Sequence, residues 1–267
     1  MIAISENTHD KIMTDEQRAL EFADKLYASA MNVVGAASGR IDDNWNRDPK
    51  IIGLTILCRT LSTFKAALIL VRANQVMEAR MLARPLYENC LWIAALRERR
   101  SRFIEKMIED DALNRKSLGQ ITMKLTVKHG GDISNPGAIL LRQIIRELAD
   151  TYKDPKKLHA SEVAAMGVIG LYYVDYTRLS LDSLHCSVTA LGRHIKSERI
   201  SENRTIVDVS VEPRLHKDET AKTVRHLCRA AMAVAIAANE LLGNTSAGGQ
   251  LTTAVQEFDR MGWARIE

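Results

Sequence analysis

Two short polar groups inside otherwise apolar stretches contain the residues best suited to chemistry. The first, Arg84 and Glu88, lies in ARMLARPLYENCLWIAAL, and a spacing of four places both side chains on one face of a helix. A buried ion pair gains little net stability, but losing one partner costs about 3–5 kcal/mol. We expect Arg84, Glu88 and Arg59 to lock two central helices together, or to form the floor of a pocket for a small polar or anionic ligand.

The second group lies in YYVDYTRLSLDSLHCSVTAL, residues 172–191. If this segment is one helix, a single narrow stripe holds most of its charged residues, which favours a solvated face. That stripe consists of Asp175, Arg178, Asp182, His185, Thr189 and Arg193. Tyr176 and Ser180 lie on the other side, where hydroxyl groups often bond backbone carbonyls one turn back. We place Tyr176 and Ser180 with the predicted buried polar cluster.

The same stripe allows a catalytic interpretation. His185 would act as general acid or base, because histidine titrates near neutral pH. Arg178 would stabilise developing phosphate charge, and Asp182 would orient the imidazole ring. Such a set would support metal-independent RNA cleavage by the ribose 2′-hydroxyl, and RNA is an expected partner only under this alternative.

Other chemistries have no motif in the chain. The patterns G-x-x-x-x-G-K-[ST], G-x-S-x-G and H-E-x-x-H do not occur. The seven histidines form no metal-ligand spacing on one helix. The sequence therefore predicts neither a metal site nor a cofactor.

The composition favours a helical protein with one core. A length of 267 residues is near the upper limit for a single core, and 14 Gly and 5 Pro are few for a β-sandwich or barrel. A net charge of +4 permits nucleic-acid binding without arguing for it. The four cysteines form no C-x-x-C pair, and the N-terminus lacks the features of a signal peptide. We expect free buried thiols, a cytoplasmic location and no membrane association.

Hydrophobic periodicity predicts an all-α, single-domain bundle of about seven to nine helices, with one short hairpin near 203–212. The main helices are expected at 14–34, 50–73, 75–97, 101–128, 135–152, 161–196 and 218–243. Pro85 predicts a kink or break in the third of these. The expected organisation is an N-terminal helix and loop at 1–48, a helical core at 49–243 and a C-terminal tail helix at 244–267.

The two polar groups resemble the motifs of a bacterial all-helical family, domain of unknown function 5677. Its first motif reads A-x-x-L-x-R-x-x-x-E and corresponds to Ala79, Leu82, Arg84 and Glu88, with the Leu one position out of register. Its second reads Y-x-x-L-S followed by H-x-S and corresponds to Tyr176, Leu179, Ser180, His185 and Ser187, with a gap one residue longer. The resemblance covers roughly residues 50–240 and implies no established activity.

A second resemblance is to the higher-eukaryote-and-prokaryote nucleotide-binding (HEPN) helical superfamily. Many of its members are ribonucleases of toxin or antiviral systems, with four to six residues between an Arg and a following His. Arg178 and His185, with six residues between them, fit that spacing, while Leu179 stands where a polar residue is usual. This resemblance implies a ribonuclease assembled as a homodimer. The leading interpretation remains a cytoplasmic binding or regulatory protein with a role in bacterial stress or defence.

Overall fold

The computed structural model describes residues 13–37, 45–184, 187–201 and 204–263. Ten α-helices lie in these ranges, which confirms the all-α bundle. They are α1 (Asp15–Ala36), α2 (Pro49–Arg72), α3 (Val76–Arg99), α4 (Ser101–Lys128), α5 (Pro136–Thr151), α6 (Ala160–Met166), α7 (Gly170–Leu179), α8 (Val188–Gly192), α9 (Glu219–Leu241) and α10 (Gly248–Arg260). A 3₁₀ turn at Trp45–Arg47, a π-helical turn at Ser180–Leu184 and strands β1 (Ile195–Ser201) and β2 (Arg204–Val209) complete the fold.

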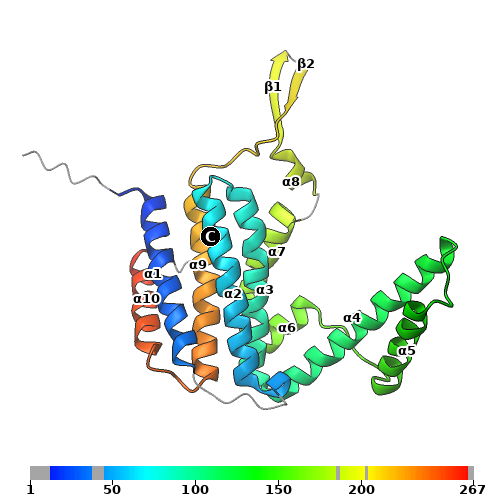
Figure 1. Cartoon of the computed structure of the whole chain (residues 1–267). Helices are drawn as coiled ribbons and strands as arrows, with labels where there is room; N and C mark the ends of the chain where they lie inside the picture. The colour runs from blue at the N-terminus through cyan, green and yellow to red at the C-terminus, as the bar shows by residue number, and fades with distance from the viewer. Residues whose placement is uncertain (1–12, 38–44, 185–186, 202–203, 264–267) are drawn as a thin grey trace, which may run out of the picture.

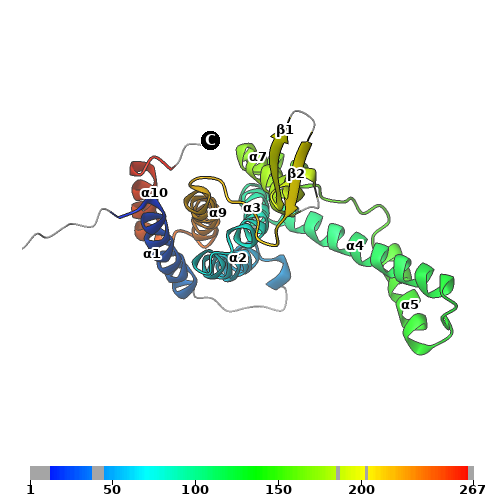
Figure 2. The ribbon, with the colours of Figure 1, turned by 90° about the horizontal axis from the view of Figure 1, so that it is seen from above.

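Helices α2, α3 and α9 form the centre of the bundle, and each packs against the other two (Figures 1 and 2). The alanines of α9 permit close approach of its neighbours. At Gly53 of α2, an added Cβ would lie 2.7 Å from Leu241 Cδ1 of α9. A buried bond from Asn89 Nδ2 to Thr60 Oγ1, 3.0 Å long, further ties α3 to α2. These three helices provide the rigid frame on which the polar residues of α3 are displayed.

Helices α1 and α10 cover the side of α9 and share its core (Figure 2). Phe22 of α1 packs against Phe258 of α10 and against Trp263, with ring centroids 5.6 and 5.8 Å apart. The described parts of segments 1–48 and 244–267 therefore belong to the same hydrophobic cluster as the rest of the bundle.

The helix starts follow local capping chemistry. Thr14 accepts a hydrogen bond from the Gln17 amide and Gln17 bonds back to Thr14, a reciprocal capping box before α1. Asp48 and Asn135 cap α2 and α5 by accepting a hydrogen bond from the Lys50 and Ala138 amides, and each is followed by a proline at the first helical position. Helix α3 continues through Pro85, so the expected break does not occur there.

Among the described helices, α2 is the one whose length and hydropathy fit a membrane span. A helix at the centre of a bundle has the same apolar composition. Because α2 packs against α1, α3 and α9, its apolar character already has an explanation within the fold.

The single long helix predicted for 161–196 is wrong. The chain leaves α6 at Gly167, and Val168 adopts a positive φ of 61° before α7 begins. After the π-helical turn, Ser187 takes an extended conformation and caps the short α8 by accepting from the Ala190 amide. Periodicity missed these interruptions because the apolar spacing continues across them.

Two parts of the chain project from the bundle (Figure 1). Helices α4 and α5 form a helical hairpin, called the arm below, which reaches away from the base of α3. Strands β1 and β2 form an antiparallel hairpin in which Ile195 pairs with Val209, and both strands are exposed along their whole length. The predicted hairpin is thus confirmed, but it starts earlier than residue 203.

Candidate functional site

Three charged residues line one face of α3 at intervals of four, namely Arg80, Arg84 and Glu88. This face meets α7 and the π-helical turn, both of which pack against α3 (Figure 1). Two polar clusters form at this contact, one around Arg84 and one around Arg80.

Arg84 bonds three side chains. Its Nη2 donates to Tyr176 Oη at 2.6 Å, its Nε to Ser180 Oγ at 3.1 Å, and its Nη1 to Glu88 Oε2 at 3.3 Å. The guanidinium also lies 4.7 Å from the centre of the Tyr176 ring, a cation–π contact. Burial raises the pKa of Tyr176, against the lowering effect of the nearby Arg84, so the phenol stays neutral.

The expected pair of Arg84 and Glu88 is therefore present, together with Tyr176 and Ser180. The Arg84 side chain is 23% exposed and that of Glu88 is 38% exposed, so the pair is only partly shielded from water. Arg59 is exposed on α2. Its expected membership of a buried cluster is wrong, because residue 59 falls on the outer face of that helix.

Asp182, on the π-helical turn, lies between two arginines. Arg80 donates to Oδ2 from Nη2 at 2.6 Å and from Nε at 3.0 Å. Arg193 donates to Oδ1 from Nη2 at 2.7 Å and from Nε at 2.9 Å. Burial alone would raise the pKa of Asp182, but the hydrogen bonds from Arg193 and Arg80 hold it below its ordinary value.

Glu219, at the start of α9, closes this cluster. It accepts from Arg193 at 2.8 and 2.9 Å, and it lies 3.6 Å from Arg80 Nε. Its pKa is also lowered, since the bonds from Arg193 and the His216 amide outweigh burial. This cluster joins α3, α9 and the segment before β1. Its two arginines and two carboxylates cancel in formal charge, so it has no net charge that would attract a ligand.

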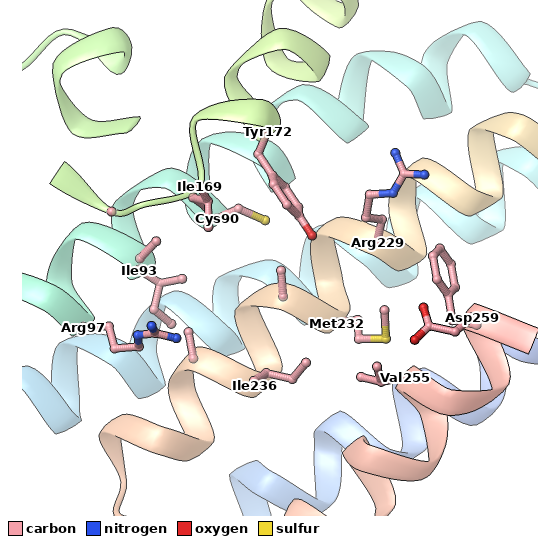
Figure 3. A pocket seen from close by; sticks show the side chains of 15 residues that line it. Cys90, Ile93, Arg97, Ile169, Tyr172, Arg229, Met232, Ile236, Val255 and Asp259 are labelled. Carbon is pink, nitrogen blue, oxygen red and sulfur yellow. The ribbon is translucent and has the colours of Figure 1, made fainter. Parts of the chain in front are cut away.

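A separate cavity of about 360 Å³ opens between α3, α9, α10 and the Gly167–Tyr172 segment (Figure 3). This volume lies within the roughly 300–1,000 Å³ range of ligand pockets. Its walls are mostly apolar and include Ile93, Ile169, Met232, Ile236 and Val255. Along α3 the lining begins at Cys90, just beyond Glu88, and it includes neither Arg84 nor Glu88, so these two residues are not the floor of the cavity.

Few polar groups face this cavity. The Tyr172 hydroxyl points across it toward α9, and Arg97 and Asp259 lie at opposite ends (Figure 3). Burial raises the pKa of Tyr172 to about 12, so its hydroxyl remains a neutral hydrogen-bonding group. Cys90 donates its S–H to the Ala230 carbonyl at 3.1 Å, and burial raises the pKa of this thiol. Neither group is activated as a nucleophile.

A family model described as "Family of unknown function (DUF5677)" matches residues 50–203. The chain belongs to this family. Neither the curated proteins nor the solved structures contain a match. The DUF5677 match includes α3, α7 and the π-helical turn, and so both polar clusters except Glu219, which follows it.

The solvated stripe predicted for this DUF5677 chain is wrong at three positions. Arg193 is 8% exposed and donates to Asp182 and Glu219. Asp175 is 1% exposed and pairs with Arg229 of α9 at 3.3 Å, and Asp182 is held by its two arginines. Arg178 is exposed at the end of α7, whereas His185 lies outside the described residues. Among the described residues, Arg80 and Arg193 hold the Asp182 carboxylate, and the HEPN-like site with His185 stays a prediction.

Sequence reasoning missed the roles of Arg80, Arg193 and Glu219 in this DUF5677 chain. The interval of four from Arg80 to Arg84 to Glu88 was a usable signal for the first. No local signal points to Glu219, because its partners lie far from it in sequence. Within the described residues, no group of three His, Cys, Asp or Glu side chains could hold a metal ion.

Proposed function

We propose that this chain binds a small molecule with an apolar body and one hydrogen-bonding group in the cavity between α3, α7, α9 and α10. The observation that carries the proposal is the cavity itself, an apolar space of about 360 Å³ with a neutral tyrosine hydroxyl directed into it. Largely apolar pockets with a few placed polar groups are the usual form of small-molecule sites. The chain would act as a binding or regulatory protein.

The cavity exists because several of the residues that line it have small side chains. Ala94 of α3, Gly167 and Ala233 and Ala237 of α9 all line the cavity, where larger side chains would fill it. At Gly167 an added Cβ would lie 2.7 Å from Ala94 Cβ, so the backbone before α7 already touches α3. The ligand would therefore contact side chains of α3, α9 and α10, with Tyr172 providing the hydrogen bond.

The polar residues at the cavity favour binding over reaction. Arg229 is tied to Asp175 at 3.3 Å and to the Trp263 carbonyl at 2.7 Å, and the thiol of Cys90 is kept protonated by burial. Raised pKa values of the thiol and of Tyr172 make both poor nucleophiles and poor bases near neutral pH.

Helix α7 connects the cavity to the two polar clusters, so it could couple ligand binding to a structural change. Tyr172 of this helix lines the cavity, and Tyr176, one turn later, accepts a hydrogen bond from Arg84. The π-helical turn that follows contains Ser180, bonded to Arg84, and Asp182, bonded to Arg80. A ligand that moves Tyr172 would therefore act on the residues that anchor the segment leading to the β-hairpin.

The test uses 8-anilinonaphthalene-1-sulfonate, an amphipathic fluorophore, titrated into the full chain by calorimetry. We expect one saturable site. Ala233→Phe should abolish it by filling the cavity, and the matched Ala233→Ser should retain it. Tyr172→Phe should weaken binding about 5-fold through loss of one hydrogen bond. Equal binding by Ala233→Phe and Ala233→Ser, with both folded, would refute the proposal.

We also propose a cytoplasmic location. Of the described cysteines, Cys58 is exposed, Cys90 and Cys228 are buried, and all three are free thiols. The expectation that every thiol is buried fails at Cys58, and Cys186 lies outside the described residues. Free thiols suit a reducing compartment.

Metal-independent RNA cleavage is kept as the second proposal, and exposure of Arg178 at the end of α7 favours it. An exposed guanidinium is accessible to an RNA phosphate. His185→Ala and Arg178→Ala should then each abolish cleavage of a single-stranded RNA, while His159→Ala, at an exposed histidine before α6, should not. Unchanged cleavage, or none by the unaltered chain, rejects this alternative.

A further inference from the structure

The arm exposes more apolar surface than any contact within the chain covers. Helix α4 packs on the bundle only near its start, and beyond that it packs against α5 alone (Figures 1 and 2). Buried residues along the two helices past this base are few. The exposed large apolar residues of the arm are Leu118, Ile121, Leu125, Val127, Ile133, Ile139, Leu140 and Ile144, each 39–66% exposed.

These residues form a stripe on each helix. On α4, Leu118, Ile121 and Leu125 recur at intervals of three and four, which is the spacing of a helix-packing face. This face is turned away from α5, because α4 meets α5 through Gly119, where an added Cβ would lie 2.9 Å from Ile145 Cγ1. The arm therefore has a second packing surface that α5 does not use.

The two stripes are flanked by opposite charges. Lys124 and Lys128 lie beside the stripe of α4, and Glu147 and Asp150 lie beside Leu140 and Ile144 on α5. All four charged side chains are exposed, and within the described residues the structure gives none of them an ion pair. The arm thus carries both halves of a complementary surface.

We propose that two copies of this chain pair through their arms to form a four-helix bundle. In an antiparallel arrangement about a two-fold axis, the stripe of each α4 lies on the stripe of α5 in the second copy. Lys124 and Lys128, near the tip of one arm, then lie beside Glu147 and Asp150, near the base of the other. A two-fold interface is self-complementary, and this arm meets that condition in both shape and charge.

A second copy suits this surface better than an unrelated partner. Two packed helices form a single layer, and an apolar face of such a layer is stable when another layer covers it. The four-helix bundle is the usual way in which two helical hairpins bury such faces. Association would cover both stripes of each arm at once.

Sedimentation equilibrium of the full chain over about 1–100 µM tests the proposal, and we expect a dimer with a Kd in the micromolar range. Leu125→Glu should raise the Kd at least about tenfold, because it places a carboxylate in the centre of the interface. Ile69→Glu, which changes an exposed isoleucine of α2, is the matched control and should leave the Kd unchanged.

Charge reversal keeps the test independent of folding defects. Lys128→Glu or Asp150→Lys alone should weaken the dimer, and the double variant should restore it by exchanging the two charges. A monomer at the highest concentration, a dimer indifferent to Leu125→Glu, or a monomer that instead co-sediments with phosphatidylglycerol vesicles would each overturn the proposal.

Discussion

Arg193 donates two hydrogen bonds, of 2.7 and 2.9 Å, to one carboxylate oxygen of Asp182, eleven residues earlier in the chain. The pair closes the segment that contains α8 into a loop. Because Arg80 bonds the other oxygen of Asp182 from α3, the loop is fixed to the central bundle. The position of the β-hairpin beyond it depends on this carboxylate and on Glu219, which also accepts from Arg193.

Asp182→Ala should destabilise the protein by about 3 kcal/mol, because it removes four hydrogen bonds and leaves two largely buried arginines beside the single carboxylate of Glu219. Chemical denaturation measures this change. Asp24→Ala is the matched control, since Asp24 accepts two hydrogen bonds from Arg72 but both side chains are about half exposed, at 59% and 45%. We expect a loss below about 1 kcal/mol there. Equal losses for the two variants would contradict the role assigned to Asp182.

The lowered pKa values of Asp182 and Glu219 predict an acid-dependent loss of stability. Because the folded state binds these protons more weakly than the unfolded chain, their contribution is complete above the ordinary carboxyl pKa of about 4. It is lost as the pH falls from about 4 through the lower pKa values of the folded state. The unfolding free energy of Asp182→Asn should therefore depend less on pH below about 4 than that of the unaltered chain, and parallel curves would argue against it.

Gly167 and Gly170 offer a matched pair at the cavity. A Cβ at Gly167 would meet Ala94 Cβ at 2.7 Å and the Ala95 amide nitrogen at 2.9 Å, whereas a Cβ at Gly170 would meet nothing within 4 Å. Gly167→Ala should therefore destabilise the fold by about 1–3 kcal/mol. Gly170→Ala should be neutral or slightly stabilising, and thermal melting would compare the two. A neutral Gly167→Ala would show that the close contact with α3 is absent.

The structure changes the stability effect expected at Glu88. Since Glu88 is 38% exposed and Arg84 keeps its bonds to Tyr176 and Ser180, Glu88→Ala should cost about 1 kcal/mol or less. Arg84→Met removes three hydrogen bonds and the contact with the Tyr176 ring, so it should cost about 2 kcal/mol. Denaturation of both variants checks the order, and a larger loss at Glu88 would restore the idea of a deeply buried pair.

The helices could be predicted from the sequence because apolar residues recur at helical spacing and the capping residues are local. For example, the hydroxyl of Thr14 and the acidic residues after it indicate that Thr14 caps the start of α1. The break at Val168 could not be predicted, since the preceding Gly167 lies against Ala94 of α3, a contact that no local spacing indicates. The break at Ser187 is a local cap, which the continuing apolar spacing conceals. Hydrophobic periodicity indicates which face of a helix is apolar, but it does not indicate the residue at which the helix ends.

The site was predictable only in part. Arg84, Glu88, Tyr176 and Ser180 come together as expected, because each interrupts an apolar helical face. Arg59 does not join them. The cavity combines residues from four separate segments, and no spacing in the sequence links these segments before the fold is known.

The most direct test of small-molecule binding follows methyl resonances of the labelled chain during titration with 8-anilinonaphthalene-1-sulfonate. The methyl groups of Met232 and Ile236, which line the cavity, should shift with saturation, while those of Met31 and Ile121, exposed elsewhere, should not. Shifts confined to Ile121 and its neighbours on the arm, with Met232 and Ile236 unchanged, would contradict the proposed site.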